Sequence, residues 1–153
     1  MGKKYTLLLN GKETGMDEVK KRFDTYNQMY FNGELGKCCF YWLVNGDTQG
    51  KYNLDEHRKN KPQSRIGISR NVRWTDETLR DVLVHEMIHM YVTTVEGKNI
   101  DGLLGHGRRF RKHMNYLNKH YGLNIKIHER FDLIHKVPEP SIFLRFLEWL
   151  IDR

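Results

Sequence analysis

The pentapeptide at residues 85–89 constrains the fold of this chain more than any other feature. It is His85-Glu86-Met87-Ile88-His89, and it lies in a stretch whose apolar residues recur with a helical period. Those apolar residues are Leu79, Val82, Leu83, Met87, Met90 and Tyr91. Residues four positions apart lie one above the other on a helix, so both imidazoles can reach one metal ion. Glu86 would then lie beside that ion, where it could take a proton from a water molecule.

Two histidines leave a catalytic zinc site one protein ligand short. A metzincin pattern would need glycine at 92 and histidine at 95, but this chain has Val92 and Val95. Glu129 is a modest candidate for the third ligand. His106 is a better one, because flanking glycines allow close backbone approach and the next predicted helix begins beside it. We therefore expect one Zn²⁺ per chain on His85, His89 and His106.

The other periodic segments predict a small α+β domain with short, mainly antiparallel strands. The expected strands lie within residues 5–9, at 38–44, from about 49, at 65–69 and at 125–127, with a polar loop at 55–63. The expected helices begin near Asp17 and end at Asn32-Gly33, run from Thr75 or Asp76 to Gly97, and span residues 107–121 before Gly122.

The C-terminal residues predict one more helix, within an extension of about residues 138–153. Eight of the twelve residues at 141–152 are large and apolar, so this helix must bury most of its circumference. It is too short to cross a bilayer. We expect it to pack on a domain core of about residues 17–121 in a monomer. A dimer interface is the alternative.

Composition places the chain among soluble single-domain proteins. It has 153 residues, 29% of them charged, and a net charge of +7, which favours an anionic partner such as nucleic acid. No apolar stretch approaches the roughly 20 residues of a membrane span. The adjacent Cys38 and Cys39 indicate reduced cysteines, as in cytoplasmic proteins.

Four segments together resemble the SprT-like family of zinc metallopeptidases. They are residues 30–35 (Tyr-Phe-Asn-Gly-Glu-Leu), 65–69 (Arg-Ile-Gly-Ile-Ser), 83–89 (Leu-Val-His-Glu-Met-Ile-His) and 105–110 (Gly-His-Gly-Arg-Arg-Phe). The resemblance covers roughly residues 17–117. It implies a zincin-like domain over residues 1–153, with zinc on His85, His89 and His106 and Glu86 as general base. The chain departs from the family at its end, where many members carry a zinc ribbon or recruitment motifs.

The family resemblance also implies cleavage of proteins at or crosslinked to DNA. A basic run beside the proposed third ligand, Arg108, Arg109, Arg111 and Lys112, is the candidate contact with single-stranded or junction-containing DNA. The expected partners are thus a protein or peptide substrate and DNA, in the cytoplasm or at the nucleoid. The alternative function is a zinc-containing DNA-binding or structural domain without significant peptidase activity.

Three further expectations concern the reaction. A substrate backbone could pair with the strand at residues 65–69. The sequence identifies no residue that stabilises the oxyanion, and Tyr91 and His113 are guesses. The remaining histidines, His57, His113, His120, His128 and His135, are expected to be surface or structural residues.

Overall fold

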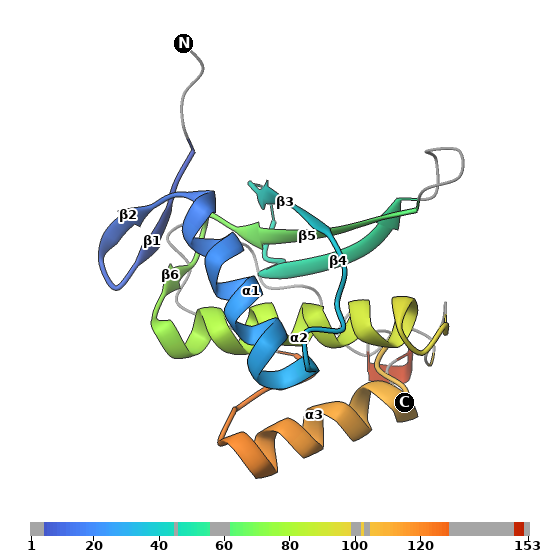
Figure 1. Cartoon of the computed structure of the whole chain (residues 1–153). Helices are drawn as coiled ribbons and strands as arrows, with labels where there is room; N and C mark the ends of the chain where they lie inside the picture. The colour runs from blue at the N-terminus through green and yellow to red at the C-terminus, as the bar shows by residue number, and fades with distance from the viewer. Residues whose placement is uncertain are drawn as a thin grey trace.

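The computed structural model describes residues 5–44, 46–55, 62–98, 102, 105–128 and 149–151. Its elements follow in the order β1 (Leu7–Leu9), β2 (Lys12–Thr14), α1 (Met16–Phe31), β3 (Cys38–Leu43), β4 (Gly50–Asp55), β5 (Gln63–Ser69), β6 (Arg73–Trp74), α2 (Asp76–Thr94) and α3 (Arg108–Tyr121) (Figure 1). The predicted α+β class is confirmed. The short strands β2 and β6 were not predicted.

The strands form two sheets, with the orders β2-β1-β6 and β3-β5-β4. The β1–β2 and β4–β5 pairs are antiparallel, whereas β1–β6 and β3–β5 are parallel. The expectation of mainly antiparallel strands was therefore wrong for the described part of the chain. The parallel pairing places Phe40 opposite Ile66 and Trp42 opposite Ile68, so these apolar side chains gather on one face of the sheet.

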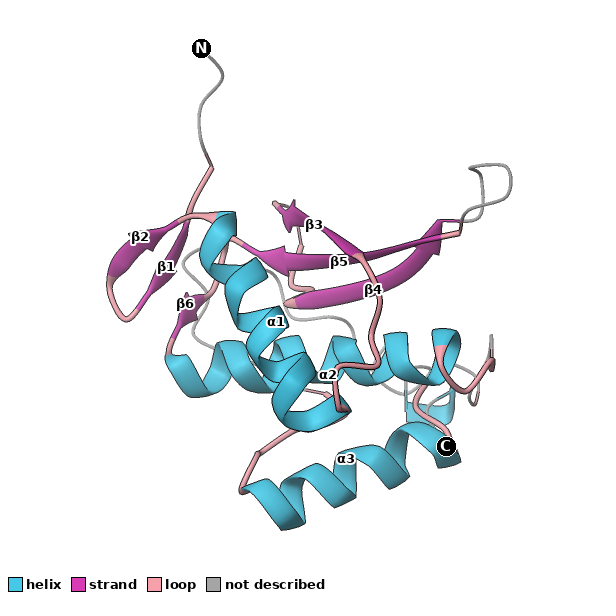
Figure 2. Ribbon diagram, in the orientation of Figure 1, coloured by secondary structure: helices cyan, strands magenta, loops and turns pink. Residues whose placement is uncertain are grey.

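The position of β5 contradicts the predicted pairing with substrate. Residues 65–69 lie within β5, which pairs with β3 on one side and with β4 on the other. Its backbone groups are therefore already used in the sheet. Among the described strands, β4 pairs with β5 alone, so β4 is an edge strand, and it runs above α2 in Figure 2. An extended chain could pair with β4 instead.

The helix α2 is the centre of the fold. It contacts α1, α3, β4 and β5, and this surrounds it with other elements. Ten of its residues are accordingly buried, including Leu83, Met87 and Ile88 at 0% exposure. A helix that is apolar on most sides is stable only in such a position. Thr75 caps it: its hydroxyl accepts from the Thr78 N–H, and the Thr78 hydroxyl accepts from the Thr75 N–H.

The turn that ends α1 explains the glycine and the asparagine within residues 30–35. Asn32 and Gly33 adopt left-handed backbone angles, with φ of 53° and 70°, and so reverse the chain. The buried Asn27 amide donates to the Leu35 carbonyl and accepts from the Leu35 N–H. The start of α1 differs from the prediction, because Gly15 occupies the N-cap position and Asp17 lies in the first turn.

The described residues include part of the two C-terminal elements that the sequence predicts. Residues 125–127 form no strand, because the Asn118 side chain takes both backbone groups of Ile125 and the chain bends at Ile127. Most of the helix predicted at 141–152 lies outside the described residues. Residues 149–151 are helical, with Trp149 and Leu150 exposed. No helix of the described chain has both the length and the apolar character needed to cross a membrane.

Candidate metal centre

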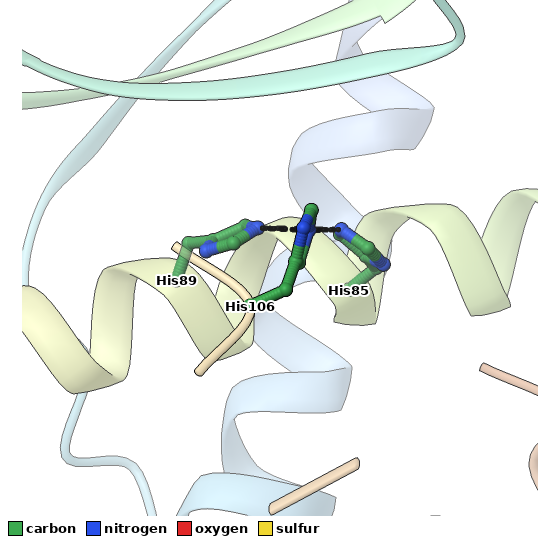
Figure 3. Close-up of side chains that lie close together, drawn as sticks. All are labelled: His85, His89 and His106. Atoms are coloured by element: carbon green, nitrogen blue, oxygen red, sulfur yellow. Dashed lines mark hydrogen bonds between the residues drawn. The ribbon is translucent and has the colours of Figure 1, made fainter. Parts of the chain in front are cut away.

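The first two candidate ligands come from adjacent turns of α2. The rings of His85 and His89 lie on the same side of α2 and face a common point, and their Nε2 atoms are 3.3 Å apart (Figure 3). The i, i+4 spacing produces this arrangement without help from any other element. The sequence prediction that both imidazoles share one face of a helix is confirmed.

The third candidate, His106, reaches the same point from the loop before α3. Its Nε2 lies 3.1 Å from that of His85 and 3.2 Å from that of His89. Gly105 makes this approach feasible. Its φ of +76° suits glycine, and a Cβ there would lie 3.1 Å from the His89 ring. The Arg111 Nε also donates to the His106 carbonyl at 2.9 Å. The glycine lets the loop lie against α2, and the arginine fixes the His106 backbone to the start of α3.

The three nitrogens match the geometry of a tetrahedral metal site. With Zn–N bonds of about 2.0–2.1 Å, two ligand nitrogens of a tetrahedron lie about 3.3 Å apart. The described residues contain one set of three or more possible ligands, and it is His85, His89 and His106. His85 Nδ1 lies 2.8 Å from the Lys126 carbonyl, which can only accept, so Nδ1 carries the proton and Nε2 is left with its lone pair. The donor set therefore fits a zinc ion.

Burial keeps His85 and His89 neutral. It lowers the pKa of His85 to about 3, with further lowering by the nearby His106 and His128. It lowers the pKa of His89 to about 2, with contributions from His85 and His106. Neutral imidazole is the form that binds a metal ion. These two imidazoles can therefore bind a cation without first losing a proton.

Glu86 lies beside the three histidines and under the edge strand. Its Oε1 is 4.0 Å from His85 Nε2, and the residue is 7% exposed. Burial raises the pKa of Glu86 to about 8, against the opposing effect of a hydrogen bond from the Tyr52 backbone N–H. At Gly50 a Cβ would lie 3.1 Å from the Glu86 carboxylate and 2.7 Å from Val82, so β4 packs directly on this residue. A nearby dication would favour the ionised carboxylate.

An aromatic ring that the sequence did not place at the site packs against all three candidate ligands. Phe110 has 0% exposure, and its ring centroid lies 4.7, 4.5 and 4.9 Å from those of His85, His89 and His106. Its spacing in α3 marked it as a core residue, and nothing in the sequence indicated which rings it would contact. The Lys126 carbonyl and Gly50 were missed for the same reason.

The two guesses for oxyanion stabilisation engage other groups. The Tyr91 hydroxyl donates to Glu34 at 3.1 Å, and the Tyr91 ring packs against Phe31. The His113 ring bonds to Glu96. Tyr91 is two positions from His89, and this places it on a different side of α2. Neither contact directs these side chains toward the three histidines.

The basic run at the start of α3 divides into two pairs. Arg109 forms an ion pair with Glu96 at 2.9 Å, and Arg111 bonds to the His106 carbonyl. Arg108 and Lys112 are exposed. Along the same helix lies a cavity of about 480 Å³, lined by Lys112, His113, Asn115, Tyr116, Lys119 and His120. This lining combines cationic and aromatic side chains.

Comparison with known proteins agrees with the geometry. Residues 19–129 match the SprT-like family. Over 121 residues the chain is 26% identical to a human (Homo sapiens) protein named DNA-dependent metalloprotease SPRTN. The aligned region is 74% of this chain and 23% of that relative, so the chain spans less than a quarter of the relative's length. At the level of the family, these similarities indicate a metalloprotease.

Proposed function

The chain belongs to the SprT-like family, and from this premise we propose that it hydrolyses peptide bonds with one zinc ion. The observation that carries the proposal is the convergence of three Nε2 atoms, 3.1 to 3.3 Å apart, beside a buried glutamate. Three protein ligands leave a fourth position for water, as catalytic zinc sites require. A structural site would have no use for Glu86.

Different residues of the protein would bind the metal, position the ligands and transfer the proton. When bound, zinc would activate water and polarise the scissile carbonyl. His85, His89 and His106 hold it, and Phe110 fixes their rings. Glu86 accepts the proton of the attacking water on its carboxylate and passes it to the nitrogen of the leaving amine. The Tyr52 N–H orients that carboxylate.

The substrate is best accommodated along β4. This strand has one partner in the described sheet, and its first residue, Gly50, lies against Glu86. An extended peptide paired with β4 would therefore pass the catalytic base with its main chain held by hydrogen bonds. The same main-chain recognition would accept many sequences, because it reads the backbone.

The direct test compares Glu86→Gln with the wild type. The amide keeps the shape of the side chain but cannot act as a base, so we expect zinc to stay bound and cleavage of a denatured protein substrate to be lost. Zinc content is measured on the same samples. Cleavage at the wild-type rate would remove Glu86 from the mechanism. A wild type that binds zinc but cleaves no substrate would favour a zinc-containing DNA-binding or structural domain.

We further propose that the substrates are DNA-associated proteins and that α3 contacts the DNA. The support is the exposure of Arg108 and Lys112, the neighbouring cavity with its lysines and aromatic rings, and the net charge of +7. The relative's name, DNA-dependent metalloprotease, points the same way. Cationic side chains bind phosphates, and aromatic rings stack on unpaired bases.

Charge reversal tests this DNA proposal. Arg108→Glu with Lys112→Glu should weaken binding of labelled single-stranded DNA and reduce its salt dependence, because fewer counterions are released. Lys20→Glu with Lys21→Glu on α1 makes the same change in net charge elsewhere and serves as the control. Equal effects of the two pairs would mean that only the overall charge matters. No effect of either would place the DNA contact elsewhere.

A further inference from the structure

The segment that follows α3 is tied to α3 at one point and to the three-histidine centre at the next. Asn118 accepts from the Ile125 N–H at 2.8 Å and donates to the Ile125 carbonyl at 2.9 Å. One residue later, the Lys126 carbonyl accepts from His85 Nδ1 at 2.8 Å. Leu123 and Ile125 are buried on one side of this segment. The path of this segment beside the centre is therefore fixed by its two buried apolar side chains and by the hydrogen bonds of its backbone.

This path brings His128 to the edge of the centre. Its ring centroid lies 6.2 Å from that of His106, at an interplanar angle of 69°. Lys126 and His128 are both exposed, and the chain bends at residues 127 and 128. His128 was expected to be a surface or structural residue, and its sequence position alone gave no reason to connect it with the ligands.

His128 and Glu86 reach the centre from different elements. Glu86 lies under β4. It packs against Gly50, and its carboxylate accepts a hydrogen bond from the Tyr52 backbone N–H. His128 comes from the segment after α3, next to His106. A peptide carbonyl bound at the centre would then have groups from two separate elements near it, the Glu86 carboxylate and the His128 imidazole. An imidazole N–H can stabilise the negative charge that develops on a carbonyl oxygen during attack by water.

We propose that His128 is a further catalytic residue, whose imidazole N–H donates a hydrogen bond to the scissile carbonyl oxygen as it becomes negatively charged. This role rests on the proposed peptidase function. The histidine transfers no proton in this step, and Glu86 remains the base. Tyr91 and His113, which engage Glu34 and Glu96, are not needed for it.

The test measures kcat, KM and zinc affinity for three variants of the full chain. His128→Ala should lower kcat by about 10²-fold with little change in KM, the loss typical of one missing donor at an oxyanion. His128→Gln keeps an N–H donor and should retain an intermediate rate. Asn124→Ala removes another exposed polar side chain from the same segment and should match the wild type. Zinc affinity, measured by competition with a chelator, should be equal in all four proteins.

The outcomes separate this proposal from the one on which it depends. A wild type that cleaves and a His128→Ala variant with equal kcat would overturn the role of His128 alone. Loss of zinc from His128→Ala would overturn it too, and would make His128 a metal ligand. A wild type that binds zinc but does not cleave would overturn the peptidase function, and the role of His128 with it. Thermal unfolding of each variant shows whether the fold is retained.

Discussion

His85 and His89 reach the candidate metal centre by a different route from His106. The first two lie on one helix, and helical geometry alone sets the 3.3 Å between their Nε2 atoms. The third lies 17 residues beyond His89 and comes within 3.2 Å of it through tertiary contacts. Those contacts are the close approach of Gly105 to His89 and the packing of the Phe110 ring against His85 and His89, while the Arg111 hydrogen bond fixes the His106 backbone from the start of α3.

The difference separates a local part of the site from a tertiary part. The local part depends on whatever stabilises α2, namely its cap at Thr75 and its burial on nearly all sides. The tertiary part depends on a few contacts made by residues 105–111, and those of Gly105 and Arg111 can be removed without changing a residue of α2. The ratio between the loss of zinc affinity and the loss of fold stability should therefore differ between substitutions in the local part and substitutions in the tertiary part.

Removal of a ligand should have the largest effect on zinc affinity in both parts. We expect His89→Ala and His106→Ala to weaken zinc binding comparably, and by more than the roughly 10–100-fold typical of losing an outer-shell partner. Chelator competition measures the affinity. Tight, stoichiometric zinc in His106→Ala would contradict the assignment and move the third ligand elsewhere. Glu129, which lies outside the described residues, would be next in line.

Gly105→Ala should disturb the tertiary part next most strongly. The substitution places a Cβ at φ +76° and 3.1 Å from the His89 ring. We expect the strain to lower the free energy of unfolding by about 1–3 kcal/mol, and the contact to weaken zinc binding in addition. Gly97→Ala is the matched control, because Gly97 has φ +71° and a Cβ there would meet no atom within 4 Å. Equal zinc affinities in the two variants would show that the His89 contact is unimportant.

Arg111→Met should have a smaller effect, confined to zinc affinity. The guanidinium positions the His106 carbonyl at 2.9 Å and is not itself a ligand. We expect about a tenfold loss of affinity, near the lower end for outer-shell partners, with partial recovery in Arg111→Lys. Arg108→Met removes the same charge from an exposed position of α3 and should leave zinc affinity unchanged. If both methionine variants lose affinity equally, the charge of α3 is responsible and not the hydrogen bond.

The same division explains how much of the site the sequence could predict. The pairing of His85 with His89 follows from local spacing, and the structure agrees. The cap of α2 was predicted at Thr75 or Asp76, and the structure has it at Thr75. His106 could be nominated from its flanking glycines, but Glu129 stayed open because sequence spacing does not determine how a loop folds back. Phe110 was identified only as an apolar residue of α3, since its three ring contacts depend on the packing of α3 against α2.

Strand pairing shows the same limit at the level of the fold. Residues 65–69 were correctly predicted to be a strand from their alternation. Their place between β3 and β4 was not predicted, because alternation indicates which side chains share a face and not which strands are neighbours. The assignment of the substrate edge to residues 65–69 failed for this reason. The helix predicted at 141–152 lies largely outside the described residues and stays a prediction.

Thr75→Ala should have the smallest effect on the centre. It tests whether the two histidines of α2 keep their arrangement when the helix is destabilised. The variant loses the hydroxyl that accepts from the Thr78 N–H, at a cost of about 1 kcal/mol in the free energy of unfolding. His85 is ten positions further along α2, or about 15 Å at the rise of an α-helix. The spacing of His85 and His89 should therefore survive, and zinc affinity should not change. Urea denaturation measures the first quantity and chelator competition the second, with Thr75→Ser as a control that keeps the cap. If zinc affinity fell in proportion to stability, the two α2 ligands would depend on the whole helix, and the distinction between a local and a tertiary part of the centre would fail.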